Sequence, residues 1–182
     1  MASIKGFQLK NVKRPLGREG YGCIATMYLH GKKIGTYEDY GDGACEDVTY
    51  VSTEAEEKMM KLIIEYAKEH PCKFIVDLYH ERPQQFKEEC ESFKKYHPYI
   101  ADEDITIDTM SANSIVYILE DLLALMEDEK QFKNHQKNGC RALSVDCDAG
   151  MMYGYPASWS DERIKAEAEG HKLYMSLDDF DK

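Results

Sequence analysis

The sequence lacks any apolar run close to the about 20 residues that a helix needs to cross a bilayer. Its N-terminus also lacks the apolar core of a signal peptide. No fixed-period repeat and no low-complexity tract occurs. Because 43% of the residues are hydrophobic and 11% aromatic, the chain can bury a core. We therefore expect a folded, soluble, cytoplasmic protein that makes no membrane contact.

Close pairs of metal ligands are also missing. A structural zinc site needs a spacing such as Cys-x2-Cys, whereas the nearest approaches here are His70 with Cys72 and Cys140 with Cys147. The sequence therefore predicts no metal and no cofactor. The six cysteines are expected to be free thiols, because a chain of this length and core content does not need a disulfide framework.

No segment spells out a catalytic motif. Cys23 and Cys45 each follow a glycine-containing turn, but a thiol nucleophile also needs a positioned histidine and an oxyanion hole, and no local pattern points to either. The glycines of residues 17–22 lack the preceding strand and following helix of a phosphate-binding loop, so they are interpreted as turn residues. We expect a protein that is not an enzyme.

Positive charge is scarce outside the N-terminal region. The chain has 34 acidic and 23 basic residues, which gives a net charge of -11. Residues 1–33 carry seven bases and one acid, Glu19, so the rest of the chain carries 16 bases against 33 acids, a balance of -17. Such a surface repels nucleic acid and suits a basic groove on a protein. We expect a protein partner and no direct contact with nucleic acid.

The N-terminal third has the alternation of a small antiparallel sheet. A first strand is expected within residues 3–14, and a hairpin pairs residues 21–29 with 34–40 around Gly31, which can adopt a positive φ angle. A third run, residues 45–51, follows a glycine turn and completes a β-meander.

The hydrophobic period then changes from two to between three and four residues. Thr53 and Glu56 have the spacing of a capping box, and an amphipathic helix is predicted over residues 54–69. The nearly apolar run at residues 72–80 is predicted to be a central strand, and residues 83–97 a second helix that begins with proline.

The second half of the chain is predicted to alternate helices with strands. In order, we expect a loop at 98–108, a long helix at 112–137, a strand at 140–147, a loop at 148–159, a short helix from Ser160 to Gly170, a strand at 171–177 and an acidic tail at 178–182. The fold class is α+β, an N-terminal antiparallel meander packed on amphipathic helices and followed by a helix-strand-helix half. A division into residues 1–98 and 99–182 is expected, the two forming one compact unit.

Carboxylates crowd the exits of the predicted strands and the tail, beside aromatic residues. The candidate partner-binding residues are Glu38, Asp39, Asp42, Glu46, Asp47, Asp178, Asp179 and Asp181. Negative charge next to flat apolar groups suits a basic protein groove. Metal-dependent hydrolysis would instead need several of these carboxylates to converge in one pocket.

Residues 9–45 resemble the opening of small proteins carried by phages, plasmids and conjugative elements of Gram-positive bacteria. The shared pattern is a Glu-Gly-Tyr-Gly start, a strand, a Gly-Lys-Lys hairpin turn, a second strand and an acidic glycine turn. This chain departs from the pattern at Ala44, where a second glycine is common, and at Cys23, where an aromatic residue is common. The size, acidity and architecture are similar to those of the type II-A anti-CRISPR inhibitors.

This resemblance implies a binding protein without catalytic residues, which acts in the cytoplasm of a bacterial host. It would be a DNA mimic that occupies the basic nucleic-acid channel of an RNA-guided nuclease, or of its RNA complex, and so inhibits a type II CRISPR system. Two alternatives stay open: a small metal-dependent enzyme that uses clustered carboxylates, and a non-catalytic adaptor for another host factor. The oligomeric state is not indicated by the sequence.

Overall fold

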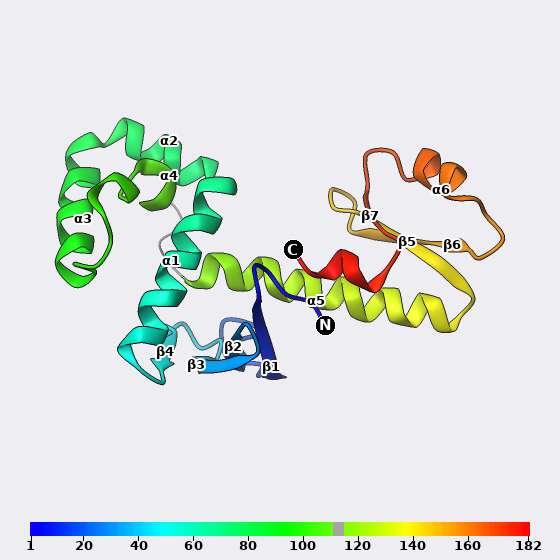
Figure 1. Cartoon of the computed structure of the whole chain (residues 1–182), viewed down its shortest axis with the longest axis horizontal. Helices are drawn as coiled ribbons and strands as arrows, with labels where there is room; N and C mark the ends of the chain where they lie inside the picture. Colours follow the sequence, from blue (N-terminus) through cyan, green and yellow to red (C-terminus); the bar gives the residue numbers. More distant parts are fainter. Residues whose placement is uncertain (111–114) are drawn as a thin grey trace. The chain divides into compact units, whose positions relative to one another are not determined.

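The computed structural model describes residues 1–110 and 115–182 and has an α+β fold (Figure 1). The chain forms two compact units, one made of residues 1–8 and 121–182 and the other of residues 9–120. The expected division at residue 98 therefore differs from the grouping in the structure. Among the described residues, no helix combines the length and apolar character that a bilayer crossing requires.

The predicted meander is confirmed as a four-stranded antiparallel sheet in the order β1-β2-β3-β4. Its strands are β1 (Phe7–Lys13), β2 (Cys23–Leu29), β3 (Lys32–Asp39) and β4 (Asp47–Tyr50). His30 and Gly31 form the turn between β2 and β3 with φ angles of 49° and 77°. Two successive left-handed residues give the turn the twist that a two-residue hairpin requires.

Helix α1 (Thr53–Glu69) packs against β3 and β4. It begins one residue earlier than expected, because the Ser52 side chain caps it by accepting a hydrogen bond from the Ala55 backbone N–H at 3.2 Å. The predicted capping role of Thr53 is therefore wrong. The apolar face predicted at Met59, Met60, Ile63, Ile64 and Ala67 is buried at every position except Met60, which is half-buried.

The expected central strand at residues 72–80 is wrong, because this segment forms helix α2 (Lys73–Glu81). A short apolar run cannot be assigned to strand or helix by its period alone. Here the helix buries Tyr79, whose ring lies 4.9 Å from that of Phe86 on the next helix, between centroids. That helix, α3 (Pro83–Tyr96), was predicted and starts with the proline as expected.

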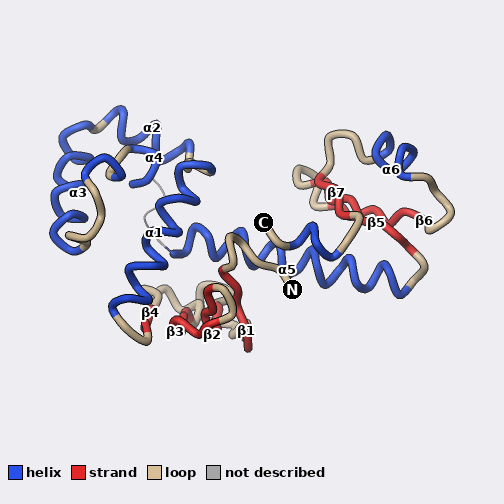
Figure 2. The backbone as a smooth tube through the Cα atoms, in the orientation of Figure 1, coloured by secondary structure: helices blue, strands red, loops and turns tan. Residues whose placement is uncertain are grey.

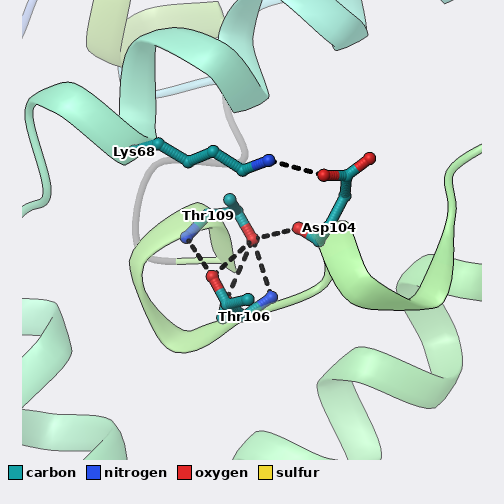
Figure 3. Close-up of polar contacts among 4 residues, drawn as sticks. All are labelled: Lys68, Asp104, Thr106 and Thr109. Atoms are coloured by element: carbon teal, nitrogen blue, oxygen red, sulfur yellow. Dashed lines mark hydrogen bonds and ion pairs between the residues drawn. The ribbon is translucent and has the colours of Figure 1, made fainter.

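The expected loop at residues 98–108 contains two short helices, η1 (Asp102–Asp104) and α4 (Ile107–Met110). Helix α4 begins with a reciprocal pair of threonines. The Thr109 N–H donates to the Thr106 hydroxyl at 3.3 Å, while the Thr106 N–H donates to the Thr109 hydroxyl at 2.8 Å (Figure 3). In the unit of residues 9–120, helices α1, α2, α3 and α4 form a helical part, in which α4 contacts α1 and α2 contacts both α3 and α4 (Figure 2).

Long helix α5 (Ile115–Lys137) ends before Asn138 and Gly139, as predicted, while its expected start at Ala112 lies outside the described residues. Strand β5 (Cys140–Asp146) follows, and Ser160 caps α6 (Asp161–Glu167). Strand β7 (Lys172–Tyr174) is also confirmed.

Residues 151–156, which were expected in a loop, form strand β6 (Met151–Pro156) instead. The sheet order is β6-β5-β7, and both edge strands run antiparallel to β5. The sheet has α6 on one face, where Ile164 packs with Tyr155 of β6. Its other face is joined to α5, because the buried Asp128 carboxylate accepts hydrogen bonds from the Tyr174 hydroxyl at 2.6 Å and the Lys172 ammonium at 3.0 Å.

The C-terminal segment is a packed part of its unit. Short helix η2 (Leu177–Phe180) buries the Phe180 ring, which stacks on Tyr174 with 4.3 Å between ring centroids. The Ser3 N–H donates to the Phe180 carbonyl at 2.8 Å, and the Lys182 N–H donates to the Ser3 carbonyl at 3.0 Å. The two terminal segments of the chain therefore pair with each other.

Candidate functional site

Two glycine-containing loops lie against each other at the exit of the β2–β3 hairpin. A Cβ atom added to Gly22 would lie 2.1 Å from the Asp39 carbonyl oxygen, and one added to Gly17 would lie 2.2 Å from that of Tyr40. The Glu19 N–H donates to the Gly41 carbonyl at 2.7 Å. The loops thus pack backbone to backbone, and no side chain fits between them at these positions. We call residues 17–22 and 38–47 the acidic platform.

Two carboxylates of the acidic platform face each other across neighbouring strands. Glu38 of β3 is the register partner of Asp47 of β4. Like charges directly opposite each other destabilise a sheet. The Tyr40 hydroxyl donates to Glu38 at 2.8 Å, and this hydrogen bond, together with the Glu38 charge, raises the pKa of Tyr40.

Two further carboxylates shape the loop itself. Asp39 accepts a hydrogen bond from the Gly41 N–H at 2.8 Å, and Asp42 accepts one from the Ala44 N–H at 3.2 Å. In both hydrogen bonds the donor is the backbone N–H two residues after the carboxylate, an arrangement that stabilises tight turns. Asp42 and Glu46 are exposed. All five residues predicted at the hairpin exit therefore lie within this short stretch of chain.

The sequence interpretation missed two charged members of the acidic platform. The Glu19 carboxylate lies against Gly43, where an added Cβ would be 2.5 Å from the Glu19 Cδ atom. Arg18 reaches the same loop, and its Nη2 atom donates to the Asp42 carbonyl at 3.3 Å. The glycine pattern of residues 17–22 was the available signal, since it marks a close approach of two backbones.

Negative charge is concentrated on this platform. Its residues include six carboxylates, those of Glu19 and the five predicted acids, against the single guanidinium of Arg18, a net charge of -5. The neighbouring buried Tyr37 has its pKa raised to about 12, first by burial and then by the charges of Asp39 and Glu46. The platform is therefore an acidic segment on a backbone fixed by glycine contacts, in which the consecutive β3 residues Glu38 and Asp39 point to opposite faces of the sheet.

The second predicted group, Asp178, Asp179 and Asp181, lies in the other unit. Asp179 accepts hydrogen bonds from the N–H groups of Met175 and Ser176, at 2.6 and 2.8 Å, and completes a capping box. Asp181 accepts a hydrogen bond from the Ser3 hydroxyl. Two of the three carboxylates thus make hydrogen bonds within the fold, although all three residues are exposed.

Thiols and metal ligands were the other candidate chemistries. All six cysteines are free, and burial raises the pKa of the Cys23 thiol, which disfavours the reactive thiolate. Over residues 1–110 and 115–182, no three His, Cys, Asp or Glu side chains are grouped so that they could hold a metal ion. The carboxylates of the acidic platform therefore do not form a metal cluster among the described residues.

The helical part of the same unit contains a surface hollow of about 340 Å³ beside α1. Its lining includes Lys68 and Asp104, whose charged groups form an ion pair at 2.5 Å (Figure 3). The buried Thr109 hydroxyl fixes this turn by donating to the Asp104 carbonyl at 2.6 Å. Because its charges neutralise each other, the hollow does not add to the acidic surface.

Comparisons with known proteins give no match: no family model fits the sequence, and neither the curated proteins nor the solved structures include a significant relative.

Proposed function

We propose that this protein is a non-catalytic inhibitor that inserts its acidic platform into a basic groove of a protein partner. The observation that supports this most directly is the pairing of Glu38 with Asp47. Opposed carboxylates destabilise the isolated sheet, and a cationic partner lying between them would replace that repulsion with attraction.

The partner proposed is the RNA-guided nuclease of a type II CRISPR system, or its complex with RNA. Such a nuclease holds nucleic acid in positively charged channels, so a fixed anionic surface can compete for the same groove. Support for this identity comes from the resemblance of residues 9–45 to proteins of mobile elements. The platform needs no metal or cofactor for this role.

The test removes charge while keeping side-chain shape. A variant with Glu38, Asp39, Asp42, Glu46 and Asp47 changed to Gln or Asn should bind the nuclease at least about tenfold more weakly, mostly through a slower association rate. Surface plasmon resonance against the purified nuclease, with and without guide RNA, measures both rates. Raising the salt from about 0.1 to 0.5 M should weaken the unmodified complex, because exposed charges are screened.

A matched control removes five exposed carboxylates elsewhere, at Glu81, Glu88, Glu91, Glu167 and Glu169. This variant has the same net charge as the platform variant, so equal loss of binding by both would show that net charge, and not the platform, attracts the partner. If the platform variant inhibits normally and inhibition depends instead on Asp178, or on Asp102 and Glu103, the binding site lies at those residues and not on the platform. An absence of any stoichiometric complex would contradict the proposal.

A further inference from the structure

Among the strands of the described residues, β6 lies at the edge of its sheet. It is the outer strand of the three-stranded sheet β6-β5-β7, so only one side of its backbone is paired with β5 (Figure 1). Unpaired N–H and C=O groups along an edge are a template for a further strand. The other edge strand, β7, has only three residues, which leaves little backbone for such pairing.

The exposed side chains of β6 are unusually apolar for this chain. Met151, Met152 and Tyr153 are consecutive, and their exposed fractions are 51%, 36% and 39%. No charged residue occurs from residue 149 to residue 159, although 31% of the whole chain is charged. Edge strands are normally protected by lysine, proline or a bulge. This stretch has no lysine, while Pro156 ends the strand and an irregularity of the β5–β6 pairing lies between Cys140 and Ala142, so residues Met151 to Gly154 stay in regular register.

The side chains of this strand are also held in place. The Tyr153 ring stacks on His171 with 5.6 Å between centroids, and its hydroxyl lies 3.7 Å from the Met151 sulfur. Gly154 allows close packing on the opposite face, where an added Cβ would lie 2.5 Å from the His135 Nδ1 atom. An ordered apolar edge loses little conformational entropy when a partner binds.

We infer that β6 pairs antiparallel with β6 of a second copy of this chain, which joins two three-stranded sheets into one of six strands. The occupant must be an extended strand without charge, because a charged strand would be desolvated against three apolar side chains. β6 of a second copy meets this requirement. In the joined sheet Met151 and Tyr153 lie on one face together with their counterparts from the second copy.

The geometry of the two edges makes this assembly a closed dimer. Pairing of β6 with β6 uses the same surface on both copies, and it leaves only the short β7 edges free. A filament would require β6 to pair with β7, which has half its length. Because one six-residue strand forms a small interface, we expect a weak dimer that depends on protein concentration.

Salt should strengthen this dimer. Each copy has a net charge of -11, so two copies repel each other, while the strand that joins them is uncharged. Screening reduces the repulsion without weakening the interface. Rising salt should therefore strengthen this dimer, whereas it should weaken the complex between the acidic platform and a basic groove.

Sedimentation velocity under reducing conditions tests the inference, over roughly 5 to 500 μM protein, a range suited to a weak interface. The average mass should rise from one chain toward two, and more steeply at higher salt. Met152→Lys places a charge on the strand edge and should raise the dissociation constant by at least about tenfold. Leu177→Lys makes the same change in charge at an exposed apolar residue outside the sheet and should have little effect.

Hydrogen exchange provides the second readout. The backbone amides of β6 should exchange more slowly at high protein concentration in the unmodified chain and not in Met152→Lys. A protein that stays monomeric over the whole range, a dimer that Met152→Lys leaves intact, or a dimer that dissociates as salt rises would each overturn the inference.

Discussion

At Gly22 one added carbon should disturb the acidic platform strongly. In Gly22→Ala the Cβ atom would lie 2.1 Å from the Asp39 carbonyl oxygen and 2.7 Å from both the Asp39 carbonyl carbon and the Gly41 nitrogen. An ordinary contact needs at least 3.4 Å, so the two loops must separate by about 1 Å. All three contacted atoms belong to the backbone, so no side-chain rotation can relieve the overlap.

The expected loss of stability has two contributions. Overpacking that forces a backbone shift costs about 1–3 kcal/mol. The shift would also strain the hydrogen bonds from Gly22 to Pro15, at 2.9 Å, and from Glu19 to Gly41, at 2.7 Å, each of which contributes about 1 kcal/mol. We expect Gly22→Ala to lower the free energy of unfolding by about 2–4 kcal/mol. For a chain of this length that corresponds to a fall in Tm of roughly 4–16 °C.

Gly31→Ala is the matched control. Gly31 has a φ angle of +77° and no atom within 4 Å of an added Cβ, so alanine there pays only the cost of a left-handed backbone, about 1 kcal/mol. Thermal unfolding followed by circular dichroism compares the two variants with the unmodified protein. If Gly22→Ala is no less stable than Gly31→Ala, the loops do not pack backbone to backbone as described.

Three further predictions concern stability and thiols. Ile64→Asp should lower the free energy of unfolding by more than about 4 kcal/mol, because it buries an unpaired charge, whereas Lys58→Asp on the exposed side of α1 should change it by less than about 1 kcal/mol; urea titration measures both. Burial would raise the pKa of Glu129, but hydrogen bonds from Lys133 and the Ala2 N–H outweigh burial and hold that pKa below its usual value. The carboxylate therefore stabilises the fold above about pH 4.3, a contribution lost as pH falls through the lowered folded-state value, so Glu129→Gln should flatten the acid side of a plot of stability against pH. Titration of the denatured, unreduced protein should find six reactive thiols, and fewer than five would contradict this.

The local patterns of the sequence were sufficient for most of the N-terminal fold. The β2–β3 hairpin could be predicted from local features alone, because side chains along β2 alternate between buried and half-buried and His30 and Gly31 form its turn. The errors fall where the local pattern was ambiguous. The apolar run at residues 72–80 is short enough to fit a helix or a strand, and it forms α2, in which Tyr79 packs on Phe86 of α3. Residues 151–156 lie among the small and aromatic residues of 148–159, which read as a loop although they pair with β5.

The members of the candidate site could be predicted from the sequence only in part. The five acids at the hairpin exit could be predicted from their clustering between strands. The contribution of Glu19 could not, because the carboxylate meets Gly43 only after two loops separated by the whole β2–β3 hairpin have come together. In the tail, Asp179 and Asp181 were grouped with the other acids by charge alone, and their hydrogen bonds show a role inside the fold.

Salt should affect binding at the two proposed surfaces in opposite directions, so its effect distinguishes one surface from the other. The acidic platform carries a net charge of -5 and would bind through opposite charge, so screening should shorten the reach of that attraction and slow association. Strand β6 carries no charge and would join two chains of net charge -11, so the same screening should favour its pairing. If both surfaces act as proposed, rising salt shifts the protein from the complex with its basic partner toward its own dimer. A shift of both equilibria in one direction would mean that one of the two surfaces has been assigned wrongly, and Met152→Lys, which leaves the platform unchanged, identifies which one.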